Sequence, residues 1–213
     1  MNKPLVMIGG GGHASVLTEI LLMQDFNLIA YVSPNVSSDE NLFKIKHHLN
    51  DNAIFQYPPD TIKLINGIGS IPKNKDLRYK IFNFYKTHGY TFASVISPKA
   101  IISPTSLLKE GVQIMHGSII QRHTTIGNNT IINTASLIEH DCNIGSHIHI
   151  APGVTICGGT RIDDHAYIGC GSTIIQSINI GKNAIIGAGS TIIKNIFENS
   201  ITYNNNETIT KLI

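Results

Sequence analysis

The chain has 213 residues, of which 42% are hydrophobic and 14% charged, and its formal net charge is +2. This composition indicates a folded protein of one or two domains, and it excludes a disordered chain and a strongly basic nucleic-acid-binding protein. No apolar run approaches the roughly 20 residues of a membrane span or replaces the early glycine cluster with a signal peptide, and the three cysteines form no CxxC pair that would suggest disulfides or structural zinc. We therefore expect a cytoplasmic protein that binds neither nucleic acid, nor membrane, nor metal.

The first half of the chain has the alternating pattern of a small parallel α/β sheet. Apolar runs and helical spacing predict three strands and two helices, at residues 5–8, 14–23, 28–32, 62–65 and 76–88. Residues 40–59 have the composition of a loop. The strand–helix–strand opening therefore predicts a βαβ unit.

A glycine turn connects the first predicted strand to the first predicted helix. Gly9 to Gly12 precede His13, and a turn of this kind lets backbone N–H groups and the helix dipole approach a phosphate. The pattern is Gly-x-Gly-x-x-Ala, and the second strand is not followed by the acidic residue that would hold a dinucleotide ribose. The turn indicates a phosphate site, with a tight turn that holds no ligand as the alternative.

The second half is dominated by a six-residue repeat. Every sixth residue from Ile102 to Ile192 is Ile or Leu, sixteen positions in all, and the slot four residues after each is never charged. A period of six fits neither an α-helix nor a coiled coil, but it fits extended chain in which side chains two apart share a face. The two slots therefore point into one interior.

A third slot, three residues after each aliphatic residue, predicts turns. Thirteen of its sixteen residues are Gly, Asn, Asp or His, which most readily adopt positive φ: Gly111, Gly117, His123, Asn129, Asp141, His147, Gly153, Gly159, His165, Gly171, Asn183, Gly189 and Asn195. Short strands joined by such turns form a parallel β-helix with three hexads, or 18 residues, in each coil. His123 is then expected above Asp141, and Arg122 above His140.

The hexads IGNNTI, IGSHIH, IGCGST and IGKNAI resemble those of left-handed β-helix acyltransferases, over about residues 96–197. MIGGGGHASVLTEIL, the later GIG and IEHDCNIGSHIHIAPG resemble the sialic acid O-acetyltransferase type of sugar acyltransferases, which includes enzymes that N-acetylate nucleotide-linked amino sugars. The resemblance implies an α/β Rossmann-like nucleotide-sugar-binding domain (residues 1–95) followed by a left-handed parallel β-helix with its tail (96–213). It also implies a homotrimer with acetyl-CoA, a co-substrate, between adjacent prisms.

Acetyl transfer from a thioester needs a base for the attacking group, and His140 is the strongest candidate. His123, His147 and His165 occupy the turn slot and so have a structural explanation. His140 has none, and it lies between Glu139 and Asp141. A carboxylate partner fixes the imidazole tautomer and stabilises the imidazolium. Either neighbour could fill this role.

The resemblance assigns roles to further residues. It implies that His140 is the general base, that Asp141 increases its basicity and that Asn133 is an active-site residue. It places acetyl-CoA against His149, Gly158, Cys170 and Ala188, and the sugar substrate against Gly10, Gly11, Gly12, His13, Ser33 and Gly69. Two features depart from the family: Ser33-Pro34 replaces paired aspartates, and the tail reads NNNETITKLI.

The function favoured by this reasoning is acetyl-CoA-dependent N-acetylation of a nucleotide-linked (UDP-type) 4-amino sugar for bacterial surface glycans. O-acetylation of a sialic-acid-like sugar is the alternative within the family. A zinc-dependent lyase with His147 and His165 as ligands and a non-catalytic sugar-binding scaffold are the alternatives outside it.

Overall fold

The computed structural model describes residues 3–72, 75–203 and 207–209. The chain divides into two compact units, one comprising Met1–Ser70 and Asp76–Pro98 and the other Ile71–Lys75 and Lys99–Ile213. Within the described ranges, no helix combines the length and apolar character needed to cross a membrane.

The first unit is built on a parallel sheet with strand order β3-β2-β1-β4. Its elements are β1 (Leu5–Ile8), α1 (Gly12–Leu22), β2 (Leu28–Val32), α2 (Glu40–Phe43), β3 (Lys46–His48), the 3₁₀ helix η1 (Asp51–Gln56), β4 (Lys63–Asn66), α3 (Lys75–Thr87) and β5 (Val95–Ile96). Strands β2 and β3 extend the sheet on one side of β1, and β4 extends it on the other. The chain therefore reverses direction across the sheet between β1 and β4, which is where ligands bind in open α/β sheets.

Residues 40–59 are more ordered than the sequence predicts. Asp39 caps α2 by accepting hydrogen bonds from the backbone N–H groups of Asn41 and Leu42, both at 3.0 Å. Asn50 caps η1 in the same way through Asn52. These elements are only three to six residues long, so their apolar periodicity is too brief to detect, and the capping residues were the available signal.

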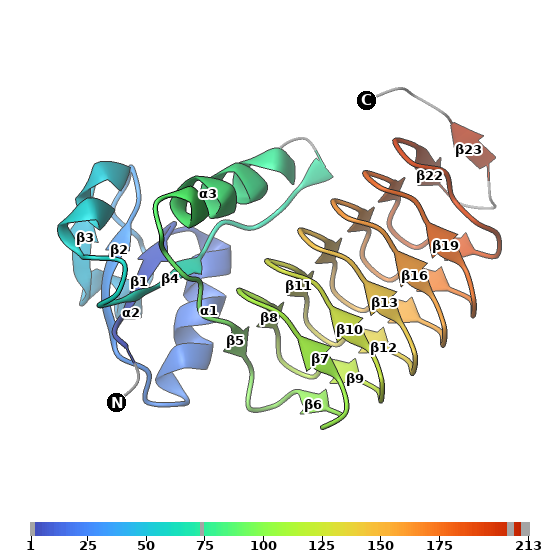
Figure 1. Cartoon of the computed structure of the whole chain (residues 1–213), viewed down its shortest axis with the longest axis horizontal. Coiled ribbons are helices and arrows are strands. Elements are labelled where there is room, and N and C mark those ends of the chain that lie inside the picture. The colour runs from blue at the N-terminus through green and yellow to red at the C-terminus, as the bar shows by residue number, and fades with distance from the viewer. Residues whose placement is uncertain (1–2, 73–74, 204–206, 210–213) are drawn as a thin grey trace. The chain divides into compact units, whose positions relative to one another are not determined.

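The second unit is a β-helix with three faces (Figure 1). Face 1 contains β8 (Gln113–Ile114), β11 (Ile131–Ile132), β14 (His149–Ile150), β17 (Tyr167–Ile168), β20 (Ile185–Ile186), β22 (Ile201–Tyr203) and β23 (Glu207–Ile209). Face 2 contains β6 (Ile101–Ile102), β9 (Ile119–Ile120), β12 (Leu137–Ile138), β15 (Thr155–Ile156), β18 (Thr173–Ile174) and β21 (Thr191–Ile192). Face 3 contains β7 (Leu107–Leu108), β10 (Thr125–Ile126), β13 (Asn143–Ile144), β16 (Arg161–Ile162) and β19 (Asn179–Ile180).

Successive strands on a face pair in parallel with a register of 18 residues, as in Ile126↔Ile144 and Ile138↔Ile156. The repeating Ile is the second residue of each two-residue strand, and from Ile114 to Ile192 it is at most 1% exposed. The predicted fold, a Rossmann-like α/β domain followed by a left-handed parallel β-helix, is confirmed.

Polar residues in the second interior slot are accommodated by bonding to the backbone. The hydroxyl groups of Ser118, Thr124 and Ser136 each donate to a carbonyl oxygen fifteen residues later, at 2.9–3.0 Å. A buried hydroxyl costs little when it is bonded in this way. The interior can therefore alternate Ile with Ser and Thr.

The predicted turn slot has positive φ in every coil from Gly111 to Gly189, including Ala135 and Ser177, which the sequence did not indicate. The last coil differs. There Asn199 has the positive φ, 54°, whereas the side-chain oxygen of Asn195 accepts a hydrogen bond from the N–H of Asn179 at 2.8 Å. The prediction of a left-handed turn at Asn195 is therefore wrong, because its side chain serves as a strand cap at the end of the helix.

Candidate active site

His140 and Asp141 lie in the turn between β12 and β13, at the corner where face 2 meets face 3. The Nδ1 atom of His140 is 2.7 Å from Oδ2 of Asp141, and both side chains are 58% exposed. If Nδ1 donates its proton to the carboxylate, the lone pair of the imidazole is on Nε2. This is the arrangement of a general base whose reactive nitrogen points away from its carboxylate partner.

Asp141 also lies within reach of a second imidazole. Nδ1 of His123, one coil earlier, is 3.5 Å from Oδ1 of Asp141. The hydrogen bond with His140 is the main reason why the pKa of Asp141 is lowered, and the charge of His123 adds to this effect. Glu139, the rival partner, instead accepts a hydrogen bond from the backbone N–H of His140 at 3.4 Å. The imidazole of His140 is thus paired with Asp141.

Gly158 leaves the space that the imidazole of His140 occupies. It lies one coil after His140 at the same corner, and a Cβ atom there would be 2.8 Å from both Cε1 and Nε2 of the ring. The N–H of the following residue, Gly159, donates to the carbonyl oxygen of His140 at 2.9 Å. Glycine at position 158 therefore keeps the ring in its observed place.

A second group of predicted residues lies on face 1 and at the corner between faces 1 and 2. Nδ2 of Asn133 is 3.3 Å from Nε2 of His149. The side-chain oxygen of Asn133 accepts the N–H of Thr134 at 2.8 Å, which orients the amide group toward His149. The ring of His149 is 7% exposed and lies 5.2 Å from that of Tyr167.

The same face carries an apolar pocket of about 290 Å³ one or two coils further on. Its lining includes Tyr167, Cys170, Ile185, Ala188 and Tyr203. Burial raises the pKa of the Tyr167 hydroxyl, and the nearby charge of Cys170 contributes. The pocket therefore joins the predicted residues Cys170 and Ala188 to His149 through Tyr167, which sequence reasoning missed although it lies 18 residues after His149.

The structure does not bring these two groups together within one chain. His140, Asp141 and Gly158 lie at the corner between faces 2 and 3, whereas Cys170, Ala188 and Asn133 lie at the corner between faces 1 and 2. The two corners are separated by the full width of face 2.

The predicted substrate residues gather at the carboxyl edge of the sheet in the first unit. A Cβ atom on Gly10 would be 3.1 Å from the side chain of Ser33, and one on Gly69 would be 3.5 Å from Cβ of His13. Gly11 is the N-cap of α1 and Gly12 its first residue, and added Cβ atoms there would meet open space. These residues follow β1, β2 and β4, so they surround the point where the strand order reverses.

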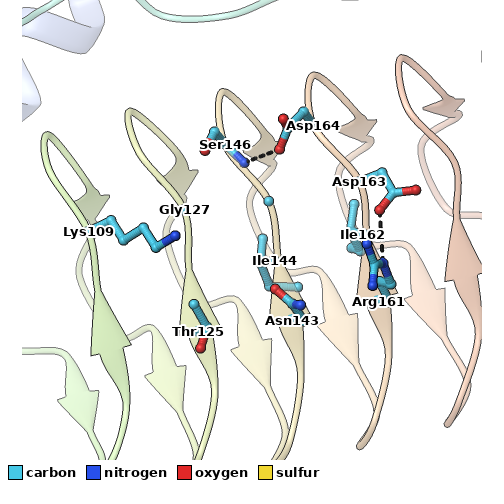
Figure 2. A pocket seen from close by; sticks show the side chains of 11 residues that line it. Lys109, Thr125, Gly127, Asn143, Ile144, Ser146, Arg161, Ile162, Asp163 and Asp164 are labelled. Carbon is cyan, nitrogen blue, oxygen red and sulfur yellow. Dashed lines mark hydrogen bonds and ion pairs between the residues drawn. The ribbon is translucent and has the colours of Figure 1, made fainter.

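A polar pocket on face 3 lies away from the predicted residues (Figure 2). Its charged groups are already paired: Nε of Arg161 lies 3.0 Å from Oδ1 of Asp163, and Oδ1 of Asp164 accepts the N–H of Ser146 at 2.7 Å. Among the residues that the structure describes, no group of three or more His, Cys, Asp or Glu side chains could hold a metal ion. His147 and His165 instead stack on each other, with ring centroids 5.1 Å apart.

Residues 4–83 match the PglD N-terminal domain. The whole chain is similar to a histidine-to-alanine mutant of GDP-perosamine N-acetyl transferase from Caulobacter crescentus in complex with CoA and GDP-perosamine, with 28% identity, a TM-score of 0.87, and coverage of 98% of this chain and 96% of that one. It also shares its fold with the acetyltransferase domain of PglB from Neisseria gonorrhoeae in complex with acetyl coenzyme A (24% identity, TM-score 0.88, coverage 99% and 100%) and with WeeI from Acinetobacter baumannii (24%, 0.80, 98% and 99%). The predicted resemblance to hexapeptide-repeat sugar acyltransferases is confirmed.

Proposed function

We propose that this chain, which has the fold of the hexapeptide-repeat sugar acetyltransferases, transfers an acetyl group from acetyl-CoA to the amino group of a nucleotide-linked 4-amino sugar. The paired imidazole and carboxylate of His140 and Asp141 carry the proposal, because an amine acceptor needs a base at the point of attack. The similarity to an N-acetyltransferase that binds CoA and GDP-perosamine supports the choice of substrate class. A UDP-type sugar for bacterial surface glycans, handled in the cytoplasm, is the specific form of the proposal.

The proposed reaction is a direct transfer. The sugar amine attacks the thioester carbonyl, and Nε2 of His140 takes the proton that the nitrogen loses. A backbone N–H group stabilises the oxyanion. When the carbon–sulfur bond breaks, the CoA thiolate leaves and recovers the proton from His140, so the enzyme returns to its starting state. Asp141 holds the imidazole in the required tautomer throughout.

A homotrimer would unite the two groups that one chain keeps apart. Around a three-fold axis, the corner of one prism that carries His140 would face the corner of the next that carries Asn133 and the apolar pocket. The outward residues at the start of face 2 support this arrangement, since Ile101 is 67% exposed and Ile119 and Leu137 follow it in the same column. Acetyl-CoA would then lie between adjacent prisms, against His149, Gly158, Cys170 and Ala188.

The substrate class is tested by following CoA thiol release with UDP- and GDP-linked 4-amino sugars and with sialic acids. We expect turnover with a nucleotide-linked amine, and mass spectrometry of the product should show an acetamide. Turnover only with a sialic acid would replace the proposal with O-acetylation. Thiol release with none of them above the rate of acetyl-CoA hydrolysis would refute both.

The assembly is tested by mixing two inactive variants, His140→Ala and Asn133→Ala, after dissociation and reassembly. If each site takes His140 from one subunit and Asn133 from the next, random mixing makes about one site in four intact. We therefore expect roughly a quarter of wild-type activity. No recovery from a mixture that light scattering shows to be trimeric would place both residues of each site on one subunit.

A further inference from the structure

Two glycine-containing loops cross at the carboxyl ends of β1 and β4. Gly9 has a φ of 108°, and a Cβ atom on it would be 3.0 Å from the backbone of Gly67. A Cβ atom on Gly67 would be 2.8 Å from the carbonyl oxygen of Ile8. The loops therefore pack backbone against backbone at the point where the strand order reverses. The second loop, Gly67–Gly69, ends on a predicted substrate residue.

Arg78 of α3 and Asn66 at the end of β4 hold this second loop reciprocally. Nη1 of Arg78 donates to the carbonyl oxygens of Asn66 and Ile68, both at 2.7 Å. The amide nitrogen of Asn66 donates to the carbonyl oxygen of Arg78 at 3.0 Å, and its side-chain oxygen accepts the N–H of Ile68 at 3.3 Å. Two buried side chains thus fix the conformation of a three-residue loop.

The guanidinium of Arg78 carries a positive charge beneath the loop. Arg78 is 3% exposed, and burial lowers its pKa to about 9, which leaves it protonated at neutral pH. Burying a charge is costly, so a purely structural lock would be better served by neutral groups. The observed choice of arginine points to a use for the charge itself.

The peptide geometry adds to this effect. In a trans peptide the carbonyl and the N–H point in opposite directions. Because the carbonyl of Ile68 points to Arg78, the N–H of Gly69 points away from it. The opposite side of the loop therefore presents an N–H donor and the field of a buried cation, and both favour an anion.

We propose that Arg78, held by Asn66, is a positioning residue that shapes the Gly67–Gly69 loop to receive the diphosphate of the nucleotide-linked sugar and stabilises its negative charge from below. This inference rests on the proposed function for the nucleotide. It assigns no contact between Arg78 and the substrate. Arg78 acts through the loop.

The test compares UDP and GDP binding, by isothermal titration calorimetry, in the full-length protein and four variants. Arg78→Met removes the charge and both bonds, Arg78→Lys keeps the charge, and Asn66→Ala loosens the lock. Lys80→Met removes an exposed positive charge from the same helix and is the matched control. Melting temperatures and the KM for acetyl-CoA are measured for every variant.

We expect Arg78→Met to weaken diphosphate binding about tenfold or more, the share of a charge-assisted interaction. Arg78→Lys should recover part of the loss, Asn66→Ala should show an intermediate loss, and Lys80→Met should bind like wild type. The KM for acetyl-CoA should not change. If Arg78→Met does not fold, Arg78→Lys and Asn66→Ala decide the question through the same measurement.

Nucleotide binding within twofold of wild type in folded Arg78 and Asn66 variants would overturn the inference and leave the proposed function standing. An equal loss in Lys80→Met would also overturn it, because any charge on the helix would then suffice. If wild type binds neither UDP nor GDP, the nucleotide-linked substrate itself is refuted and the inference falls with it. Nucleotide binding without acetyl transfer would refute the proposed function alone.

Discussion

Replacing Gly158 with alanine should disable the enzyme without destabilising it. The new Cβ atom would lie 2.8 Å from Cε1 and Nε2 of His140, whereas ordinary van der Waals contact begins near 3.4 Å. The ring must therefore move by at least about 0.6 Å, and a misplacement of roughly 1 Å at a reacting group can cost on the order of 100-fold in rate. The 2.7 Å bond to Asp141 would be strained or lost in the same movement.

The stability of this variant should be unchanged or slightly higher. The positive φ at this corner belongs to Gly159, so alanine at position 158 meets no left-handed backbone. Glycine-to-alanine changes at compatible positions stabilise by about 0.4–1 kcal/mol through the unfolded chain. The ring that must shift is exposed and can rotate toward solvent at little cost.

The assay is CoA thiol release under saturating substrates, together with a thermal melt. We expect kcat to fall roughly 10- to 100-fold with no drop in melting temperature. Gln176→Ala is the matched control, because Gln176 is exposed at the same corner one coil further from His140. A kcat within twofold of wild type would refute the reasoning about the ring, and a raised KM for acetyl-CoA with unchanged kcat would instead assign Gly158 to donor binding.

Three further results are expected. His140→Ala should lower kcat about 10²–10⁴-fold and leave acetyl-CoA binding intact, and a variant that keeps more than a tenth of wild-type kcat would exclude His140 as the base. Asp141→Asn should move the acid limb of the pH–rate profile to lower pH, because the imidazolium loses a stabilising charge; the lowered pKa of Asp141 keeps the carboxylate itself ionised over that range, and an unmoved profile would shift the role to Glu139. Ile156→Ala, in the buried ladder, should destabilise the chain by about 3–4 kcal/mol in urea titrations, whereas a cost no larger than that of Thr155→Ala would contradict the role of the ladder.

The β-helix could be predicted in detail because its repeat has no interruption. Sixteen consecutive hexads fix both the inward residues and the 18-residue register, and neither depends on the rest of the chain. The departures occur where the coil overrides local preference. Ala135 and Ser177 adopt positive φ because the coils before and after them impose the turn, at a cost of about 1–2 kcal/mol each.

The first unit was predicted less completely for the opposite reason. Its short elements β3 and η1 are defined by pairing and capping rather than by periodicity. Arg78 escaped notice because a single arginine in an amphipathic helix reads as an exposed charge, and only the packing of α3 near the Gly67–Gly69 loop shows that it is buried. Burial of one residue in a helix depends on long-range packing, which a single sequence does not record.

The repeat also explains why the candidate base can lie where it does. At each corner the side chains of successive coils are one strand spacing, about 4.8 Å, apart, so a bulky ring needs a small residue in the neighbouring coil. His140 meets this requirement through Gly158, and its partner Asp141 occupies the left-handed turn position, where φ is 58°. The turn that closes the coil thus directs the carboxylate toward the imidazole, and the next coil leaves room for it. Three residues in two consecutive hexad columns are therefore enough to convert a structural corner into a site for proton transfer.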